Sequence, residues 1–513
     1  MKNKKILLQN VLVFVPFFQL YIVNFFQIRI AETIKLFIFA GIYLLLFNIS
    51  RIAFNRYFRI KNTEYFLVII FYLSFNYSNI TIFVYFEAFD AIKYIPNYSF
   101  FSFLILTVLL LLVSTRSFFD KLFEYLILFY VVFVVLISFN SIGFGLQEKN
   151  IDTQVKNDYI NINLETKPDL YFIIYDGLPS LETMEQFYDY DSIKFEKLFN
   201  ENNLTNYGLA TSSFGRTKYT MSSLFNMEYI FEEGDIPFSD RAILSNKYRT
   251  GDTVFENILR NNNYSIYKFG MAFNCNKNKK DICLNENIKN YTEKNSVYYD
   301  LIMRTPLKIL IEKGLVTLSP SLSIGCQNGC NDPELDEIFI NIDNKNKPKA
   351  VFLHFMDTHG PYLLGKNCKL LDEPIFDLPK TNIKSYKESL DCALKKISDL
   401  ITILDLENDI VFIQSDHGPN YEKMELTDIE DLTTEQVLNR YSTFSISNLD
   451  TFCDKSNNNL NNTVNTFVYF TNCFAISEIP LLESKNFLAF GKINSFVFDI
   501  TDVVQEALLS NYK

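Results

Sequence analysis

Histidine and positive charge are both scarce in this chain. Its 513 residues contain three histidines, and 48 Lys and Arg stand against 59 Asp and Glu, which gives a net charge of −11. The acidic balance argues against nucleic acid as a partner, because a protein that binds the phosphate backbone needs a basic surface. No internal repeat is visible, and the length allows two or three domains.

Cysteine is absent from the first 147 residues, and all eight cysteines lie in the rest of the chain. The charge is divided in the same way: residues 1–147 carry a net +6, so the whole-chain value of −11 leaves −17 for the remainder. An even set of cysteines in one part predicts disulfides and an oxidising compartment. Free thiols or a zinc cluster are the alternatives. The simplest pairing joins neighbours in sequence: Cys275 with Cys283, Cys326 with Cys330, Cys368 with Cys392, and Cys453 with Cys473.

Residues 1–146 are rich in Phe, Leu, Ile, Val and Tyr and predict a transmembrane domain. A spanning helix needs roughly 17–25 apolar residues. Five stretches have this length or nearly so: Ile6–Phe26, Thr33–Ile49, Tyr65–Phe86, Phe100–Val113 and Leu122–Phe144. The first has no small-residue cleavage site and more apolar stretches follow it, which disfavours a cleavable signal peptide. A buried helical core is the alternative, but it does not explain the run of spans.

The basic residues between these stretches predict the orientation. Lys2, Lys4 and Lys5 precede the first stretch, and a basic loop follows the second, whereas the loop after the third is acidic. Basic loops face the cytoplasm, so five spans leave everything after about Gly145 outside, in agreement with the cysteines. We therefore expect a polar linker at 147–167 and an extracytoplasmic domain at 168–513.

The part after the linker alternates short apolar runs with helical periodicity. This alternation predicts an α/β domain with a mainly parallel central sheet and a site at the carboxyl ends of its strands. Strands are expected at Asp169–Tyr175, Lys349–Phe355, Ile410–Gln414, Tyr441–Ser447 and Asn494–Asp499. Helices are expected at Leu181–Asn203, from about Thr217, and at Thr253–Asn262, Ser385–Leu406 and Asp502–Ser510. Much of Asn274–Asn331 is expected to form loops tied by disulfides. The segment Thr427–Asn439 is expected to be helical or loop-like.

Three of these strands lead into residues that can bind a metal. Asp176 follows the first, His354 and His359 lie in LHFMDTHGPY, and Asp416 and His417 lie in SDHG. A single histidine would be interpreted as structural, but all three in the chain lie near strand ends beside aspartates. Two carboxylates and one imidazole form a ligand set that suits zinc or manganese. Such a metal lowers the pKa of a hydroxyl, and the other histidines can stabilise a phosphoryl oxygen or protonate a leaving group.

A candidate for that hydroxyl lies in Ala210–Ile230, where Gly215 can form a tight turn before a helix. A hydroxyl residue at a helix start lies where backbone N–H groups and the helix dipole favour an anion.

The SDHG motif, the strand that ends in Asp-Gly and the HFMDTHGPY stretch resemble the alkaline phosphatase superfamily. Within it, the chain is similar to membrane-bound sulfatase-like proteins, namely phosphoethanolamine transferases and lipoteichoic acid synthases. Those families have about five N-terminal spans and an extracytoplasmic catalytic domain. The resemblance therefore implies an alkaline-phosphatase/sulfatase-like α/β fold in an integral protein of the bacterial inner (cytoplasmic) membrane.

The resemblance also implies roles for particular residues. Asp176, Asp416 and His417 match the family's ligands for one divalent metal ion, with Zn or Mn expected. Thr217 matches the nucleophile, itself a metal ligand, because Gly-Arg-Thr leads into the helix; Ser212, Ser213 and Thr220 are the alternatives. His354 and His359 match the pair that contacts the transferred phosphoryl group or a second metal. Arg216 is a candidate for holding phosphate, or else a surface charge.

The chain departs from the family pattern at three points. The first ligand is Asp where the transferases usually have Glu. No histidine follows His417, which argues against a full two-zinc site. Neither Cys-x-Pro-x-Arg nor Ser-x-Pro-x-Arg is present, so the formylglycine of true sulfatases is excluded, and sulfate-ester hydrolysis is disfavoured.

The resemblance implies a transferase. Its donor would be a membrane phospholipid, its acceptor an envelope glycan or lipid, and its intermediate a phosphothreonine that carries phosphoethanolamine or phosphoglycerol. Two alternatives stay open: a hydrolase of phosphoesters outside the cytoplasm, and a non-catalytic envelope protein that keeps the fold.

Overall fold

The computed structural model describes one long helix and a few single positions in residues 1–156, and most of the chain after that. The described ranges are 30–57, 157–208, 210–235, 251–270, parts of 273–284, 335–343, 348–360, parts of 362–379, 382–420, 429–453, 462–489 and 496–511. The chain divides into two compact units, residues 1–153 with 294–327, and residues 154–293 with 328–513. Each unit is described separately below.

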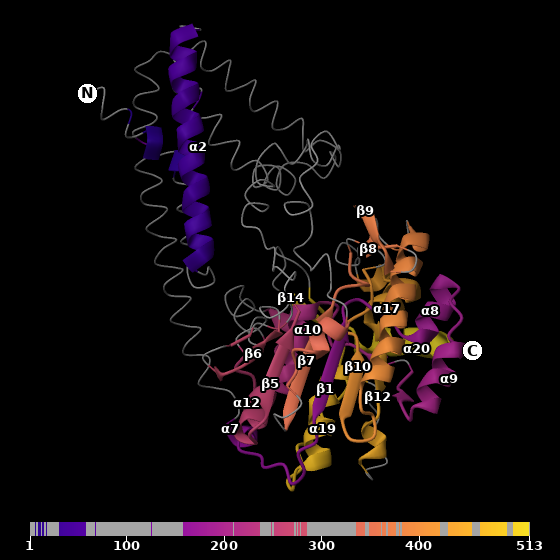
Figure 1. Ribbon diagram of the computed structural model, residues 1–513. Helices are drawn as coiled ribbons and strands as arrows, with labels where there is room; N and C mark the ends of the chain where they lie inside the picture. Colours follow the sequence, from indigo (N-terminus) through magenta and orange to yellow (C-terminus); the bar gives the residue numbers. More distant parts are fainter. Residues whose placement is uncertain are drawn as a thin grey trace. The chain divides into compact units, whose positions relative to one another are not determined.

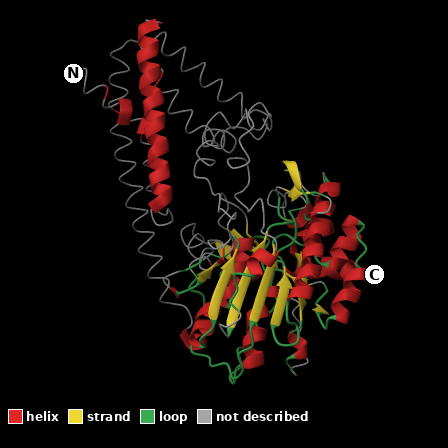
Figure 2. Cartoon of the chain, in the orientation of Figure 1, coloured by secondary structure: helices red, strands yellow, loops and turns green. Residues whose placement is uncertain are grey.

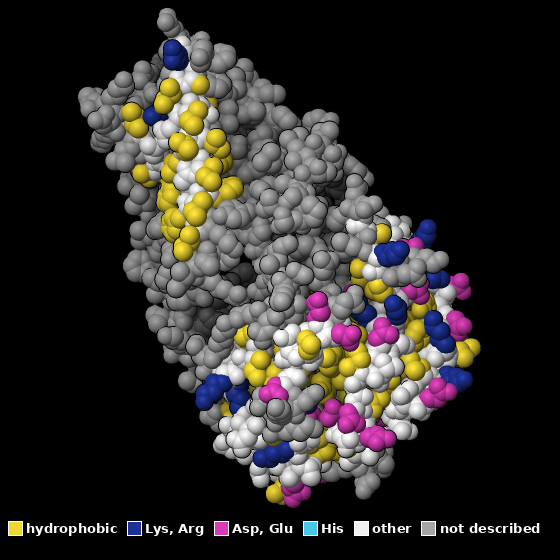
Figure 3. All heavy atoms as spheres, in the orientation of Figure 1, with side chains coloured by type: hydrophobic (Ala, Val, Ile, Leu, Met, Phe, Trp, Pro, Cys, Tyr) yellow, Lys and Arg dark blue, Asp and Glu magenta, His cyan; other side chains and the backbone are white. Residues whose placement is uncertain are grey.

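In the first unit, helix α2 (Ile30–Tyr57) is long and apolar enough to cross a membrane, by length and composition. Its window Leu36–Ala53 has a mean hydropathy of 1.9 and overlaps the second predicted span. Apolar side chains such as Ile38, Leu45 and Ile52 are exposed along it (Figure 3). It is the one such helix among the described residues, and the other four predicted spans fall almost wholly outside them.

The second unit is built on a seven-stranded sheet with the order β2-β12-β10-β1-β7-β5-β6. Five strands run parallel; their order across the sheet can be followed in Figure 1. Their bounds are β1 Leu170–Tyr175, β5 Ser265–Phe269, β6 Ile282–Cys283, β7 Lys349–Phe355 and β10 Ile410–Gln414. At one edge, β12 (Ser445–Ser447) pairs antiparallel with β10, and β2 (Thr205–Asn206) pairs antiparallel with β12. The predicted mainly parallel α/β sheet is therefore confirmed.

The central strands β1, β7 and β10 are buried along their whole length, because helices cover both faces of the sheet (Figure 2). Tyr171 and Ile173 of β1 pack in one core, with α17 (Ile383–Ile403), α8 (Leu181–Tyr188), α9 (Ile193–Glu201) and α16 (Leu335–Phe339). Phe172 packs in the other, with α10 (Thr217–Asn226), α12 (Val254–Asn261) and α19 (Thr466–Phe474). The site at the end of these strands thus rests on two packed layers.

Smaller elements surround this sandwich. Helices α18 (Thr434–Tyr441) and α20 (Thr501–Asn511) pack together, and α7 (Asn157–Ile160) begins the unit. The 3₁₀ turns are η7 (Ile429–Asp431), η8 (Leu449–Thr451) and η9 (Thr463–Asn465). The small sheets are β3 (Ala210–Thr211) with β11 (Ser442–Thr443), β8 (Tyr362–Leu364) with β9 (Leu370–Ile375), and β14 (Phe496–Asp499) with β13 (Phe487–Ala489) and β4 (Gly234–Asp235).

Three expectations about the elements need correction. The predicted helix Leu181–Asn203 is two helices, because Asp189 has a left-handed backbone with φ 48°. Tyr441–Ser447 is not one strand: it is divided between β11 and β12, which lie in different sheets. The strand predicted at Asn494–Asp499 exists as β14, but it pairs outside the central sheet.

Three of the four predicted disulfides are present: Cys275–Cys283, Cys368–Cys392 and Cys453–Cys473. Cys326 and Cys330 lie outside the described residues. Pairing by order along the chain is therefore confirmed wherever the structure describes both cysteines.

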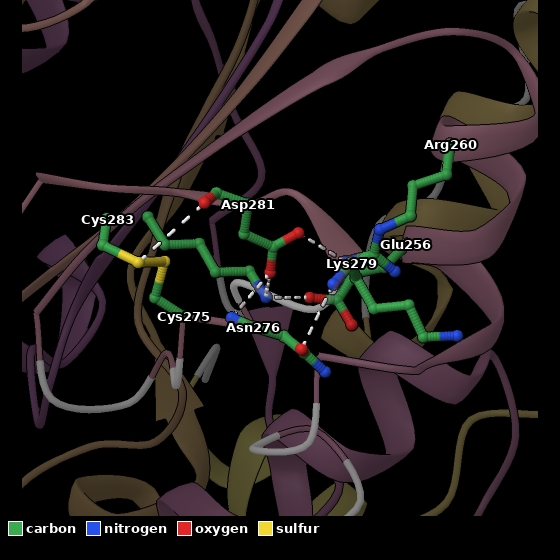
Figure 4. Close-up of a disulfide and its surroundings, with 8 residues drawn as sticks. Glu256, Arg260, Cys275, Asn276, Lys279, Asp281 and Cys283 are labelled. Carbon is green, nitrogen blue, oxygen red and sulfur yellow. Dashed lines mark hydrogen bonds and ion pairs between the residues drawn. A yellow bond between two sulfur atoms is a disulfide. The ribbon is translucent and has the colours of Figure 1, made fainter.

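The Cys275–Cys283 disulfide closes a loop beside a buried ion-pair network, here called the Lys268 cluster (Glu256, Arg260, Lys268 and Asp281). Figure 4 labels the disulfide, Glu256, Arg260 and Asp281. Lys268 Nζ lies 2.5 Å from Glu256 Oε1 and 2.9 Å from Asp281 Oδ2. Arg260 Nη2 lies 2.7 Å from the other oxygen of Asp281. Each carboxylate of this cluster thus faces a cation from the chain itself, as buried charges require.

Candidate active site

The carboxyl ends of β1, β7 and β10 meet at one edge of the sheet, because β1 lies between the other two and all three are parallel. Ile174 pairs with His354 on β7 and with Gln414 on β10. The residues that follow each strand therefore come together, and the three predicted segments converge as the sequence indicates.

Asp176, Asp416 and His417, here called the Asp176 cluster, offer ligand atoms that all lie within 4.8 Å of one another. All three are buried. His417 Nε2 lies 3.3 Å from Asp416 Oδ2 and 3.9 Å from Asp176 Oδ1. These three residues are predicted metal ligands, together with Thr217, and they form a compact set of oxygen and nitrogen donors.

Thr217 completes the cluster. Its Oγ1 lies 3.2 Å from Asp176 Oδ2, to which it donates, and 3.2 Å from His417 Nε2. Thr217 is the first residue of α10, and Arg216 before it has an extended backbone without a side-chain cap. The hydroxyl is therefore at the helix start, where backbone N–H groups and the helix dipole favour negative charge.

The alternative hydroxyls are placed differently. Thr220 Oγ1 donates to the Phe214 carbonyl at 2.8 Å, and Ser213 Oγ donates to Asn462 Oδ1 at 2.9 Å. Ser212 is fully buried. Among the described residues, none of these three hydroxyls hydrogen-bonds to the Asp176 cluster, whereas Thr217 does. The geometry therefore favours Thr217. Its role as nucleophile stays a prediction.

The two remaining histidines border the cluster from the β7 side. His354 is buried, with Nε2 3.3 Å from Asp176 Oδ2, and the ring of Phe273 meets it edge-on. His359 Nε2 lies 4.0 Å from Asp176 Oδ1, and its side chain is 40% exposed. His359 thus stands between the cluster and solvent, where a substrate group can reach it. Arg216 is half-buried and lines a small cavity next to Thr217.

The electrostatics of the cluster favour an ionised Asp176 and a neutral His417. Burial acts to raise the pKa of Asp176, but the imidazoles of His359, His354 and His417 outweigh it and lower that pKa below the ordinary value. Burial lowers the pKa of His417 below its ordinary value of 6.5, although the Asp416 and Asp176 carboxylates act in the opposite direction.

The residues present fit a divalent cation. Asp176 Oδ1 and Asp416 Oδ2 are buried and make no hydrogen bond with any residue that the structure describes. Buried carboxylate oxygens are costly unless paired, and carboxylate oxygens and an imidazole nitrogen are both ligand types that zinc accepts. His417 Nδ1 lies 2.9 Å from the Gly418 carbonyl, which assigns its proton to Nδ1 and leaves the Nε2 lone pair free for a metal.

Hydrogen bonds from neighbouring segments hold the ligands in place. Asp416 Oδ1 accepts from the backbone N–H groups of Gly177 and His417. Thr358 Oγ1 donates to the Asp176 carbonyl at 2.6 Å, and Tyr386 Oη donates to the Gly177 carbonyl at 2.9 Å. Sequence reasoning missed Thr358, Tyr386 and also Arg440, which contacts the same loops, because no local pattern marks these contacts.

The sulfatase family model matches residues 172–471, more than half of the chain. No curated protein sequence matches. Solved structures that match include the C-terminal periplasmic domain of EcEptC from Escherichia coli in complex with Zn (12% identity, 65% of this chain and 93% of that chain, TM-score 0.38). Lipooligosaccharide phosphoethanolamine transferase A (EptA) from Neisseria meningitidis also matches (13%, 85% and 87%, TM-score 0.35). A third is the lipoteichoic acid synthase LtaP from Listeria monocytogenes (13%, 57% and 70%, TM-score 0.32).

The family match spans the segments that carry Asp176, Thr217, His354 and His359, and Asp416 with His417, so the site described above lies within the matched region. The predicted resemblance to sulfatase-like proteins is thereby confirmed. The chain belongs to the sulfatase family.

Proposed function

We propose that the chain is a membrane-anchored transferase. It moves phosphoethanolamine or phosphoglycerol from a membrane phospholipid to a glycan or lipid of the cell envelope. The observation that carries this proposal is the position of the Thr217 hydroxyl, 3.2 Å from both Asp176 Oδ2 and His417 Nε2. A threonine there suits a sulfatase-family chain that has no formylglycine motif, because a covalent nucleophile divides one difficult displacement into two.

In the first step, the Thr217 oxygen forms a bond to the head-group phosphorus, and the bond from that phosphorus to the diacylglycerol oxygen breaks. Asp176 accepts a hydrogen bond from this hydroxyl and orients it, but the lowered pKa of Asp176 makes its carboxylate a weak base, so the hydroxyl proton passes to solvent. His359 supplies the proton that the diacylglycerol oxygen takes up, since it stands at the exposed side of the cluster.

In the second step, an acceptor hydroxyl attacks the same phosphorus and gives its proton to His359. The phosphorus–Thr217 bond breaks, and the Thr217 oxygen takes a proton from solvent. Asp176, Asp416, His417 and Thr217 would hold one divalent ion, zinc or manganese, which when bound supplies Lewis acidity that lowers the pKa of a hydroxyl. His354 and Arg216 orient the phosphoryl oxygens.

A lipid donor requires that the protein be held at a membrane, and the apolar part of the chain supports such an anchor. The helix α2 and the four further apolar stretches of residues 1–146 suit a five-span domain in the cytoplasmic membrane. A linker at 147–167 would then lead to an extracytoplasmic domain at 168–513. Three disulfides in the second unit suit an oxidising compartment, and such an anchor would bring Thr217 to a lipid donor.

A mass spectrum of the Thr217 peptide tests the proposal. Detergent-purified full-length protein is incubated with Zn²⁺ and phosphatidylethanolamine or phosphatidylglycerol. We expect a phosphoethanolamine or phosphoglycerol adduct on Thr217, retained in Thr217→Ser and absent in Thr217→Ala. Turnover of Thr217→Ala should fall on the order of 10³-fold or more, as for other nucleophiles.

The matched control is Thr402→Ala on α17, whose exposed hydroxyl donates to the Asp399 carbonyl. It should keep wild-type turnover. Full turnover by Thr217→Ala would rule out the mechanism. An adduct on Thr217 whose release needs only water would identify a hydrolase. A chain that binds no metal and forms no adduct would be a non-catalytic envelope protein.

A further inference from the structure

We infer that Arg440 is a positioning residue that joins the two loops of the site, the one before Thr217 and the one that carries Asp416 and His417. Arg440 lies near the end of α18, well away in sequence from both loops. Its effect on metal affinity follows from the site geometry alone, whereas its effect on turnover rests on the function proposed above.

The guanidinium of Arg440 bonds two backbone carbonyls. Nη1 donates to the Gly418 carbonyl at 3.1 Å, and Nη2 donates to the Gly215 carbonyl. The main chain adds a third link, because the Gly418 N–H donates to the Arg440 carbonyl at 3.0 Å. Arg440 therefore makes two hydrogen bonds to Gly418, at the end of the metal-ligand loop, and one to Gly215, at the start of the nucleophile loop.

The Gly418 carbonyl is the same one that accepts from His417 Nδ1. By donating to it, Arg440 fixes the acceptor that assigns the His417 proton to Nδ1. The His417 Nε2 lone pair then faces Thr217 Oγ1 and the two carboxylates. An outer partner of this kind is what sets the orientation of a metal-binding imidazole.

Both loops lie too close to α18 to carry a side chain at the contact. A Cβ on Gly215 would stand 3.0 Å from Cγ and Nε of Arg440, and a Cβ on Gly418 would collide with the Asn439 carbonyl. The glycines thus allow the approach that the guanidinium bridges. A planar guanidinium presents parallel donors in a rigid fork, whereas a lysine ammonium presents a single point charge that cannot match two separated carbonyls in the same way.

The test compares Arg440→Ala and Arg440→Lys with the control Arg260→Ala, which removes a partly buried arginine from the Lys268 cluster. The dissociation constant for Zn²⁺ is measured by competition with a chromophoric chelator, and kcat and KM on phospholipid are measured at saturating Zn²⁺. We expect Arg440→Ala to bind Zn²⁺ about 10- to 100-fold more weakly. At saturating Zn²⁺ its kcat should fall with KM nearly unchanged, because Thr217 is displaced while the substrate contacts remain.

Added guanidinium should restore part of the Zn²⁺ affinity and of kcat to Arg440→Ala, and nothing to Arg260→Ala. Arg440→Lys, which keeps the charge and most of the packing, should show the same losses to a smaller degree and serves as the test if Arg440→Ala does not fold. Wild-type Zn²⁺ affinity in either Arg440 variant, or equal losses in Arg260→Ala, would overturn the inference. If the wild-type protein binds Zn²⁺ but leaves phospholipid intact, the proposed function fails, and the Zn²⁺ comparison still decides the role of Arg440.

Discussion

Two groups of buried charge in the α/β unit are built in opposite ways. In the Lys268 cluster, each carboxylate faces a lysine or arginine at 2.5–2.9 Å. In the Asp176 cluster, the described part of the chain brings no lysine or arginine to the carboxylates, and two of their oxygens are left without a hydrogen bond. The first cluster supplies its cations from its own sequence. The second has none from its own sequence within the residues that the structure describes, which fits the metal ion proposed above.

This contrast distinguishes the two sets of carboxylates more clearly than burial does, because the carboxylates of both clusters are buried. A buried carboxylate oxygen without a hydrogen bond costs free energy, and the Asp176 cluster brings two of them, Asp176 Oδ1 and Asp416 Oδ2, together within one site. Three changes test this difference between the clusters by their effect on the free energy of unfolding. They are given from the largest expected effect to the smallest.

The largest effect is expected for Lys268→Met. It leaves Glu256 with no lysine partner, and Asp281 with Arg260 alone, in a site where their side chains are about 1% exposed. Removing one partner of a buried pair costs about 3–5 kcal/mol, so urea unfolding should show a loss of this size. The control is Lys197→Met, which breaks an exposed pair with Glu201 on α9 and should cost less than about 1 kcal/mol. Equal losses in the two variants would contradict the structural role of Lys268.

The next effect is stabilisation by metal. Zn²⁺ at 100 times its dissociation constant should raise the free energy of unfolding of the wild-type protein by about 2.7 kcal/mol, because it binds the folded chain. Asp416→Asn should remove this gain, since it takes a charge from the Asp176 cluster. Without metal, Asp416→Asn should be no less stable than wild type, because it relieves an unpaired buried charge. Thermal unfolding with and without Zn²⁺ measures both, and Lys268→Met should keep the gain from Zn²⁺.

The smallest effect is expected for Tyr386→Phe, which removes only the hydrogen bond from the Tyr386 hydroxyl to the Gly177 carbonyl. One such bond contributes about 1 kcal/mol. Burial raises the pKa of Tyr386 well above its ordinary value of 10, so the bond is present at any pH where the protein is used. The loss of stability should therefore be constant from pH 6 to 9 in chemical unfolding experiments. A loss that varied over this range would point to a different origin.

The sequence predicts the parts of the site that follow buried strands. Asp176, His354 and Asp416 could be found because an apolar run that ends in polar residues at a sheet edge is a local signal. The choice of Thr217 over Ser212, Ser213 and Thr220 rests on the resemblance of Gly-Arg-Thr to the nucleophile segment of the family, and the structure places Thr217 at the start of α10. The cysteine pairs could be found because they are neighbours along the chain.

The contacts that sequence did not reveal join segments that are distant along the chain. Lys268 lies in a strand that was not predicted, since a lysine within SIYKF weakens the apolar pattern, and its burial depends on Glu256 and Asp281. The helix α19 was also missed. Arg440 lies on α18 and acts on Gly215 and Gly418, so no window of sequence contains the contact. The break at Asp189 depends on a left-handed backbone that asparagine and glycine adopt more often than aspartate.

The sheet order has a consequence for how the protein is made. Leu170 of β1 pairs with Ala350 and with Ile410, so the central strand has neither neighbour until most of the chain has been synthesised. Such long-range pairing gives a high contact order and slow folding. If the unit is exported as proposed, the apolar side chains of β1 stay exposed until β7 and β10 have also been synthesised and exported. A chaperone outside the cytoplasm, or the membrane surface itself, would have to shield it during that interval.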